Sequence, residues 1–266
     1  MLETILFGLL VGFLVGLTGV GGGSLMSPYL LAIGVPAPTA IGTDLVFATI
    51  TKLFGSASHY RLKSINFQVV LFLALGSVPA GLLGVVTVNR LQTVFAPETV
   101  EYYLKTAIGV VVVFVGATLI LRYFIPERRN GPNGEDSPRW DGFSKMTLKR
   151  RVLTILLGAF AGYLVGLTSI GSGTMIAIIL LLAYPLTTSV IVGTDIAHAT
   201  ILSFVVGVAH AASGNVNFSL VWTLLIGAVP GVLIGSRLTK VVPGNLLRGI
   251  LAAMLIFVGT RLVLTA

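Results

Sequence analysis

Long apolar stretches separated by short polar segments run along most of the chain. Six of them approach or exceed the ~20 residues that a membrane-spanning helix needs. These six are residues 38–58, 67–88, 100–125, 187–212, 218–236 and 246–265. The remaining apolar stretches form two pairs, 4–18 with 24–35 and 151–168 with 174–184, and a glycine-rich run interrupts each pair. If each interrupted pair is one unit, the pattern predicts an all-α, polytopic membrane protein with about eight hydrophobic segments.

The sequence contains an internal repeat. Residues 12–26 (GFLVGLTGVGGGSLM) and 162–176 (GYLVGLTSIGSGTMI) are identical at eight of fifteen positions. The correspondence continues at an offset of 151 between the pairs Gly42 and Gly193, Thr43 and Thr194, Asp44 and Asp195, His59 and His210, and Asn66 and Asn217. We therefore predict two homologous membrane repeats, 1–125 and 150–266, joined by a polar connecting loop at 126–149.

Composition and charge support a membrane protein. Apolar residues make up 55% of the chain and charged residues only 10%, too few to cover the surface of a soluble enzyme. The net charge is +8, but eight of the 17 Lys and Arg residues lie between Arg122 and Arg151. Such clustering is typical of a cytoplasmic loop, so we expect no nucleic-acid binding.

The orientation of the two halves has two possible solutions. If each interrupted pair crosses the bilayer once, the halves run parallel. If each pair is a re-entrant hairpin, each half has three full spans and the repeats are inverted. With the 126–149 loop inside, inversion places Arg237, Lys240 and Arg248 inside as well, whereas the parallel arrangement places them outside. The positive-inside rule therefore favours inverted repeats.

The two glycine-rich interruptions are the first candidate binding site. Glycine lets the backbone approach a ligand closely, and irregular backbone at membrane depth persists only where it is buried in protein or lines a cavity. A helix is expected to begin after each interruption, and its free N–H groups attract an anion. The alternative is close helix packing or a simple kink. The predicted substrate-binding residues are Gly19, Gly21, Gly22, Gly23, Ser24, Ser169, Gly171, Ser172, Gly173 and Thr174.

Ionisable residues within apolar stretches are the second candidate, because each is expensive in lipid. Lys52 is predicted to supply a cation for an anionic substrate. The residues predicted for gating or proton coupling are Asp44, Asp195, His198, His59 and His210. Two alternatives are open: Asp44 and Asp195 follow Gly-Thr near an expected helix start and can be N-caps. His59 and His210 lie near helix ends and can be interfacial hydrogen-bonding residues.

Several classes of chemistry lack their sequence signals. The chain has no cysteine, no HExxH motif and no GxxxxGK[ST] loop. No arrangement of nucleophile and base suggests hydrolysis. We therefore expect no enzyme activity, no metal site and no cofactor.

The motifs together resemble those of the TauE/SafE family of sulfite exporters. The resemblance rests on residues 17–24 (LTGVGGGS), 40–45 (AIGTDL), 58–61 (SHYR) and 215–218 (NVNF), and the repeat extends it to nearly the whole chain outside 126–149. It implies a small secondary transporter, multi-pass in the cell membrane, for sulfite or an organosulfonate such as sulfoacetate. We predict export of such an anion with proton coupling; the alternative is an uncoupled, channel-like conduit for a small anion or neutral solute. The expected partners are a small anionic substrate and the lipid bilayer.

Overall fold

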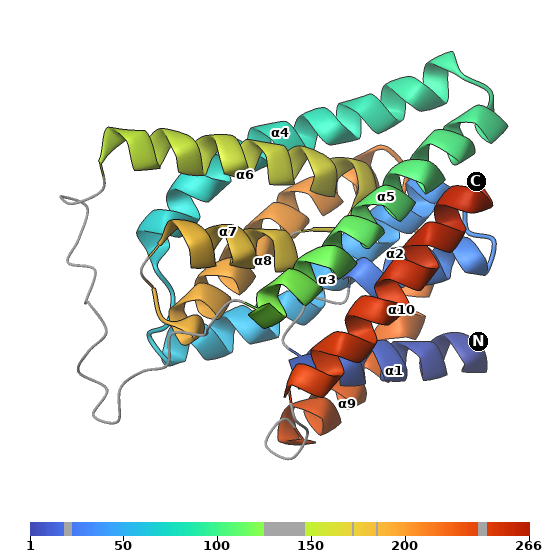
Figure 1. Ribbon diagram of the computed structural model, residues 1–266. Helices are drawn as coiled ribbons and strands as arrows, with labels where there is room; N and C mark the ends of the chain where they lie inside the picture. The colour runs from blue at the N-terminus through green and yellow to red at the C-terminus, as the bar shows by residue number, and fades with distance from the viewer. Residues whose placement is uncertain (19–22, 125–146, 172, 185, 239–243) are drawn as a thin grey trace.

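The computed structural model describes residues 1–18, 23–124, 147–171, 173–184, 186–238 and 244–266 (Figure 1). The described residues form ten α-helices and no strand, which confirms the predicted all-α class. The helices are α1 (Leu2–Thr18), α2 (Gly23–Ala32), α3 (Ala37–Arg61), α4 (Phe67–Val94), α5 (Pro97–Phe124), α6 (Leu148–Thr168), α7 (Thr174–Ala183), α8 (Thr188–Ala212), α9 (Phe218–Leu238) and α10 (Gly244–Leu264).

Five of the described helical segments are long and apolar enough to cross a membrane. They are Phe67–Val94, Pro97–Leu121, Leu148–Thr168, Ser189–Ala212 and Phe218–Gly235. Large apolar side chains on these helices are exposed, among them Leu75, Phe114, Phe160, Phe204 and Trp222. Exposed apolar surface of this extent fits a lipid environment, because water would penalise it.

Helix α3 has 25 residues but is not one of the five apolar segments. It carries Asp44 and Lys52, which lower its apolar character, and both side chains are buried within the protein. Charged groups in a membrane protein are expected to face the interior in this way. The least apolar long helix is therefore also a central one.

Matching glycines hold two equivalent helix pairs together. Helix α1 packs on α9, and the corresponding helix α6 packs on α4. A Cβ atom at Gly12 would overlap the backbone of Ala228, and one at the equivalent Gly162 would overlap the backbone of Ser77. Only a residue without a side chain permits such close backbone approach, as in other membrane helix pairs. Each pair contains one helix from each half of the sequence.

Helices α3 and α8 form the central contact between the halves, and they run antiparallel. Gly42, near the start of α3, lies against His210 and Asn215 at the end of α8. Gly193, near the start of α8, lies in the same way against His59 and Ser64 at the end of α3. The repeated glycines and histidines are therefore parts of one reciprocal interface.

Backbone hydrogen bonds complete this interface in both halves. The backbone N–H of Asn217 donates to Thr43 Oγ1 at 3.0 Å, and that of Asn66 donates to Thr194 Oγ1, also at 3.0 Å. The Asn66 side chain then accepts from the N–H of Val69 and caps α4. Thr43 and Thr194 thus position the first turn of the helix that follows in the opposite half.

Helices α5 and α10 also pack antiparallel, as their adjacent ribbons show in Figure 1. Gly109 of α5 lies against Gly259 and Val263, whereas Gly116, two turns later, lies against Ala252 and Ile256. The start of α5 and the end of α10 therefore lie at the same end of the molecule. In the repeat, α3 corresponds to α8 and α5 corresponds to α10. The two helices of each of these pairs pack against each other in antiparallel directions.

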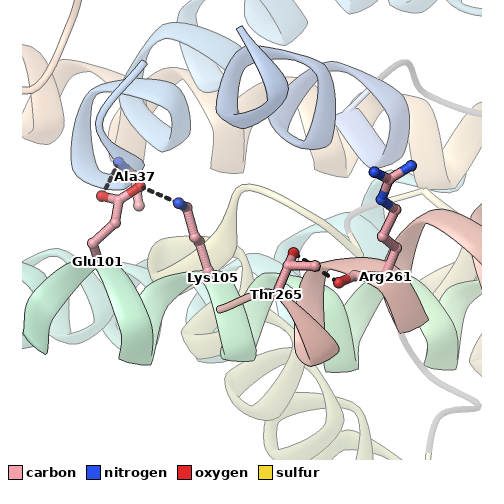
Figure 2. A network of polar contacts seen from close by, with 5 residues as sticks. All are labelled: Ala37, Glu101, Lys105, Arg261 and Thr265. Atoms are coloured by element: carbon pink, nitrogen blue, oxygen red, sulfur yellow. Dashed lines mark hydrogen bonds and ion pairs between the residues drawn. The ribbon is translucent and has the colours of Figure 1, made fainter. Parts of the chain in front are cut away.

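Helix α3 begins well before Asp44. Pro36 is its N-cap residue, and the N–H of Ala37 donates to Glu101 Oε2 of α5 at 2.8 Å (Figure 2). Glu101 Oε1 also forms an ion pair with Lys105 Nζ at 3.4 Å. A carboxylate at this end of a helix compensates its unpaired N–H groups and its dipole.

The second interruption separates α6 from α7. Helix α6 ends at Thr168, and Ser169 has a left-handed conformation with φ of 63°. Gly171 follows with φ of 107°, and α7 begins at Thr174. In the first half α1 ends at Thr18 and α2 begins at Gly23, and residues 19–22 lie outside the described residues.

Candidate functional site

A cavity of about 430 Å³ opens between helices of both halves. Its polar lining comes from Thr51, Lys52, Ser58, His59 and Asp195. The rest of the lining is small or apolar and consists of Val15, Gly16, Phe54, Gly55, Gly173, Ile196, Ala199, Val232 and Leu233. The volume lies within the ~300–1,000 Å³ range of ligand pockets, which combine apolar walls with a few polar groups.

Lys52 is the cation of this cavity. Its side chain is only 9% exposed, so its charge requires compensation from nearby groups. It interacts electrostatically with the carboxylates of Asp195 and Asp44, more strongly with that of Asp195. The interaction with His198 is electrostatic as well. The structure thus brings together four ionisable residues that the sequence analysis selected from two distant segments.

Asp44 lies outside the cavity lining, in a cluster of hydroxyl groups. Its Oδ2 atom accepts hydrogen bonds from Ser27 Oγ at 2.8 Å and from Ser169 Oγ at 2.6 Å. The two serine oxygens are 2.6 Å from each other. Asp44 and Ser27 are completely buried and Ser169 is 4% exposed. The cluster joins α2 and α3 of the first half to the segment after α6.

The N-cap alternative for the two aspartates is wrong. Helices α3 and α8 begin at Ala37 and Thr188, so Asp44 and Asp195 each lie seven residues inside a helix. Their side chains point into the protein interior and are buried there. Neither aspartate is placed to cap the start of its own helix.

The three histidines occupy different environments. His198 is completely buried, and its Nε2 atom lies 2.7 Å from Ser77 Oγ. His210 is also buried, and its Nε2–H donates to the carbonyl oxygen of Gly166 at 3.0 Å. His59 Nδ1 lies 2.8 Å from Ser64 Oγ, at the edge of the cavity. His59 and His210 thus stabilise helix ends, and His59 also faces the cavity.

The glycine-rich residues are described only in part. Gly19, Gly21, Gly22 and Ser172 lie outside the described residues. Gly23 begins α2 and Ser24 is buried, while Thr174 begins α7. Gly173 is the N-cap residue of α7 and lines the cavity with Lys52. The start of one predicted helix and the predicted cation therefore meet at one cavity.

Sequence reasoning missed the hydroxyl partners. Ser27, Thr51, Ser58 and Ser77 each contact a selected ionisable residue or line the cavity beside one. An isolated serine in an apolar helix gives no signal in one sequence, because small residues also serve helix packing.

Among the described residues, no group of three or more metal-binding side chains comes together.

Comparison with known proteins decides the family. A family model described as sulfite exporter TauE/SafE matches residues 4–262. The chain belongs to the TauE/SafE family.

Two relatives of this TauE/SafE protein align with nearly its whole length, and a third aligns with part of it. It is 43% identical over 260 residues to the probable membrane transporter protein YjnA of Bacillus subtilis, an alignment that covers 97% of this chain and 98% of YjnA. The probable membrane transporter protein YdhB of the same organism is 29% identical over 245 residues, 90% of each chain. Sulfite exporter TauE/SafE family protein 3 of Arabidopsis thaliana is 32% identical over 85 residues, which cover 32% of this chain and 18% of that protein. No solved structure matches the chain.

The family determines the general class of function. TauE/SafE proteins form a membrane transporter family and not an enzyme family. The five apolar helical segments agree with a multi-pass membrane protein. The chain is therefore a TauE/SafE membrane transporter, and the ionisable residues near the cavity require an explanation in terms of transport.

Proposed function

We propose that this TauE/SafE protein is a secondary transporter that exports a small sulfur-containing anion, sulfite or an organosulfonate such as sulfoacetate, with coupling to protons. The observation that carries the proposal is the cavity that contains Lys52 and the start of α7. An anion in this cavity would lie near the Lys52 charge and near Gly173, the N-cap residue of α7. The first N–H groups of a helix and the positive end of its dipole attract an anion.

The neutral walls of the cavity suit a substrate with an organic part. Val15, Phe54 and Val232 offer apolar surface beside the polar group of Lys52. Asp195 balances the Lys52 charge when no anion is bound. Its carboxylate also repels an entering anion and so weakens anion binding. Interactions of this kind favour reversible binding, which a transporter needs at its central site.

We also propose that the two repeats, 1–125 and 150–266, have inverted topology. The antiparallel packing of α5 on α10 supports this, because helices at equivalent positions of parallel repeats would run in the same direction. Lys105 and Arg261 lie at the same end of this pair (Figure 2), as inversion requires. Arg151 lies over the Phe72 ring at 5.6 Å, so the first turns of α4 and α6 lie side by side.

The transport proposal is tested with purified protein in proteoliposomes. Radiolabelled sulfite and sulfoacetate are loaded inside, and efflux is followed with and without a pH gradient. We expect efflux of at least one anion and a change of its rate with the gradient. Equal rates at every gradient would favour the uncoupled conduit, and no efflux of either anion would contradict the proposal.

A matched glycine pair tests the cavity in the same assay. Gly173→Leu places a side chain into the cavity at the start of α7, and we expect it to abolish efflux. Gly249→Leu is the control, because no atom lies within 4 Å of a Cβ atom at Gly249. Both variants should insert into the membrane. Normal efflux by Gly173→Leu would contradict the proposal that the anion binds in this cavity during transport.

Inverted topology is tested by labelling with a membrane-impermeant maleimide. Since the chain has no cysteine, Lys105→Cys and Arg261→Cys each introduce a unique thiol. We expect both to react from outside the cell and Lys63→Cys to react only after permeabilisation. Reaction of Lys105→Cys and Arg261→Cys from opposite sides would support parallel repeats.

A further inference from the structure

The buried oxygen cluster of Asp44, Ser27 and Ser169 is separate from the proposed anion cavity. Asp44 does not line that cavity, and its second oxygen, Oδ1, is buried and has no hydrogen-bond partner among the residues that the structure describes. The Oδ2 atom and the two serine oxygens form a closed triangle with edges of 2.8, 2.6 and 2.6 Å. All three edges have the length of an O–H···O hydrogen bond.

A count of protons distinguishes two states of this triangle. Each serine hydroxyl supplies one proton, and an ionised carboxylate supplies none. With Asp44 ionised, two protons serve three edges, and two oxygens face each other at hydrogen-bond distance without a proton between them. With one further proton on Asp44 Oδ2, the direction of one serine–carboxylate bond reverses: Oδ2 donates to one serine, that serine donates to the other, and the second serine donates back to Oδ2. Each oxygen then donates once and accepts once, and the ring is complete.

The remaining geometry favours the same state. An ionised Asp44 would leave a charged oxygen, Oδ1, buried without a donor from the described part of the chain, which is costly inside a protein. The edges are also too short for a metal ion such as Na⁺ to lie in the plane between the three oxygens, since each oxygen contacts the next directly. The cluster therefore matches a proton in size and in hydrogen-bonding capacity.

We propose that Asp44, Ser27 and Ser169 form a proton-binding site at the junction of the two halves. The role of this proton in transport rests on the proposed function: its binding favours anion binding in the cavity. With Asp44 neutral, Lys52 and Asp195 balance each other, whereas ionised Asp44 adds a second negative charge that opposes the anion. By linkage, anion binding must favour proton binding to the same degree.

The helices that pack against α3 carry few titratable side chains that could affect the charge of Asp44. Helices α2, α5, α8 and α9 pack against α3. Their buried or half-buried titratable side chains are Tyr29 on α2, Glu101 and Lys105 on α5, and Asp195, His198 and His210 on α8. Residues 218–235 of α9 contain no titratable side chain. Among the described residues, Lys52 is the charged group that acts on the Asp44 carboxyl. Lys52 is therefore the link between the proton site and the cavity.

Infrared difference spectroscopy tests the proton site directly. The purified protein is measured in lipid nanodiscs at about pH 6, where exposed carboxyls are ionised. We expect the carbonyl band of one protonated carboxyl in the wild-type protein and its loss in Asp44→Asn. The matched control is Asp195→Asn at the equivalent position of the repeat, which should keep the band. A band that survives Asp44→Asn, or is absent from the wild type, would overturn the site.

Flux measurements on the same variants separate this proposal from the proposed function. We expect wild-type anion affinity to rise as the pH falls, and Asp44→Asn to lose that pH dependence while it still binds anion. If the band is lost in Asp44→Asn but wild-type affinity does not change with pH, the link between proton and anion is wrong. If the wild type moves no sulfur anion at all, the proposed function fails, and the spectra still decide the proton site.

Discussion

Asp44 and Asp195 occupy equivalent positions of the repeat but have different surroundings. Asp44 is enclosed by the hydroxyls of Ser27 and Ser169. At the positions that correspond to these serines, the other half has Ala177 and Gly19, which carry no hydroxyl. Asp195 instead lines the cavity beside Lys52. Duplication has thus produced one aspartate in a closed hydrogen-bonded cluster and one beside a ligand-sized space.

The same contrast extends to the neighbours of the aspartates. The position equivalent to Lys52 is Ser203, and the position equivalent to His198 is Phe47. In contrast, three interface residues of the first half, Gly42, Thr43 and Asn66, correspond to the identical residues Gly193, Thr194 and Asn217 of the second half. The repeat retains these residues at the interface and retains both aspartates, whereas it differs in the residues that surround the aspartates: Lys52, His198, Ser27 and Ser169 have no identical counterpart.

Removal of the cavity cation should have the largest effect. For Lys52→Met we expect anion affinity to fall about 30-fold or more, since loss of a buried charged partner costs about 2 kcal/mol or more. The repeat-equivalent control is Ser203→Ala, which should bind normally. The double variant Lys52→Met/Asp195→Asn restores charge balance, and it should fold and still fail to bind. Equal losses of anion affinity in Lys52→Met and Ser203→Ala would contradict the conclusion that only Lys52, of these two equivalent positions, binds the anion.

The shared interface should respond to substitution in both halves. A Cβ atom at Gly42 or Gly193 would overlap the carbonyl oxygen of Asn215 or Ser64. We expect Gly42→Ala and Gly193→Ala each to destabilise the protein by about 1–3 kcal/mol, measured as thermal unfolding in detergent. Gly207→Ala is the control, because the nearest atoms lie at an ordinary 3.5 Å. Destabilisation by only one of the two interface variants would contradict the reciprocal interface.

The smallest effect concerns the paired threonines. Thr43→Val and Thr194→Val each remove one hydrogen bond to a backbone N–H, and we expect a loss of ~1 kcal/mol in each case. Thr223→Val is the control and should cost less, because the half-buried Thr223 hydroxyl donates only within its own helix, to the carbonyl oxygen of Ser219. Similar losses in the two variants would sharpen the comparison, and a clearly unequal pair would show that the halves are joined asymmetrically.

Much of the fold was predictable because lipid constrains a membrane helix strongly. The apolar stretches, the interruption before Thr174 and the internal repeat all correspond to features of the structure. The N-cap alternative for Asp44 would start α3 at that residue, whereas the helix begins at Ala37. Pro36 and Pro38 gave the relevant signal, since proline is favoured in the first turn of a helix.

The candidate site was only partly predictable. Lys52 and Asp195 were selected because charges within apolar segments are rare and costly. Their convergence on one cavity depends on the packing of α3 against α8, which no local pattern specifies. Ser27 and Ser169 could not be recognised as partners of Asp44, because the three residues are far apart in sequence and serine is common in packed helices.

The central claim is that the anion binds beside Lys52 at the start of α7, in the cavity that Asp195 also lines. Selenite resembles sulfite in shape and charge and scatters X-rays anomalously at the selenium edge. In crystals soaked with selenite, the account predicts an anomalous peak in this cavity about 4 Å from Lys52 Nζ, because a selenite oxygen at hydrogen-bond distance from Nζ (about 3 Å) lies between the nitrogen and the selenium. The same peak should be absent from Lys52→Met crystals. A peak beside Asp44, or one in the cavity that persists without Lys52, would contradict the account.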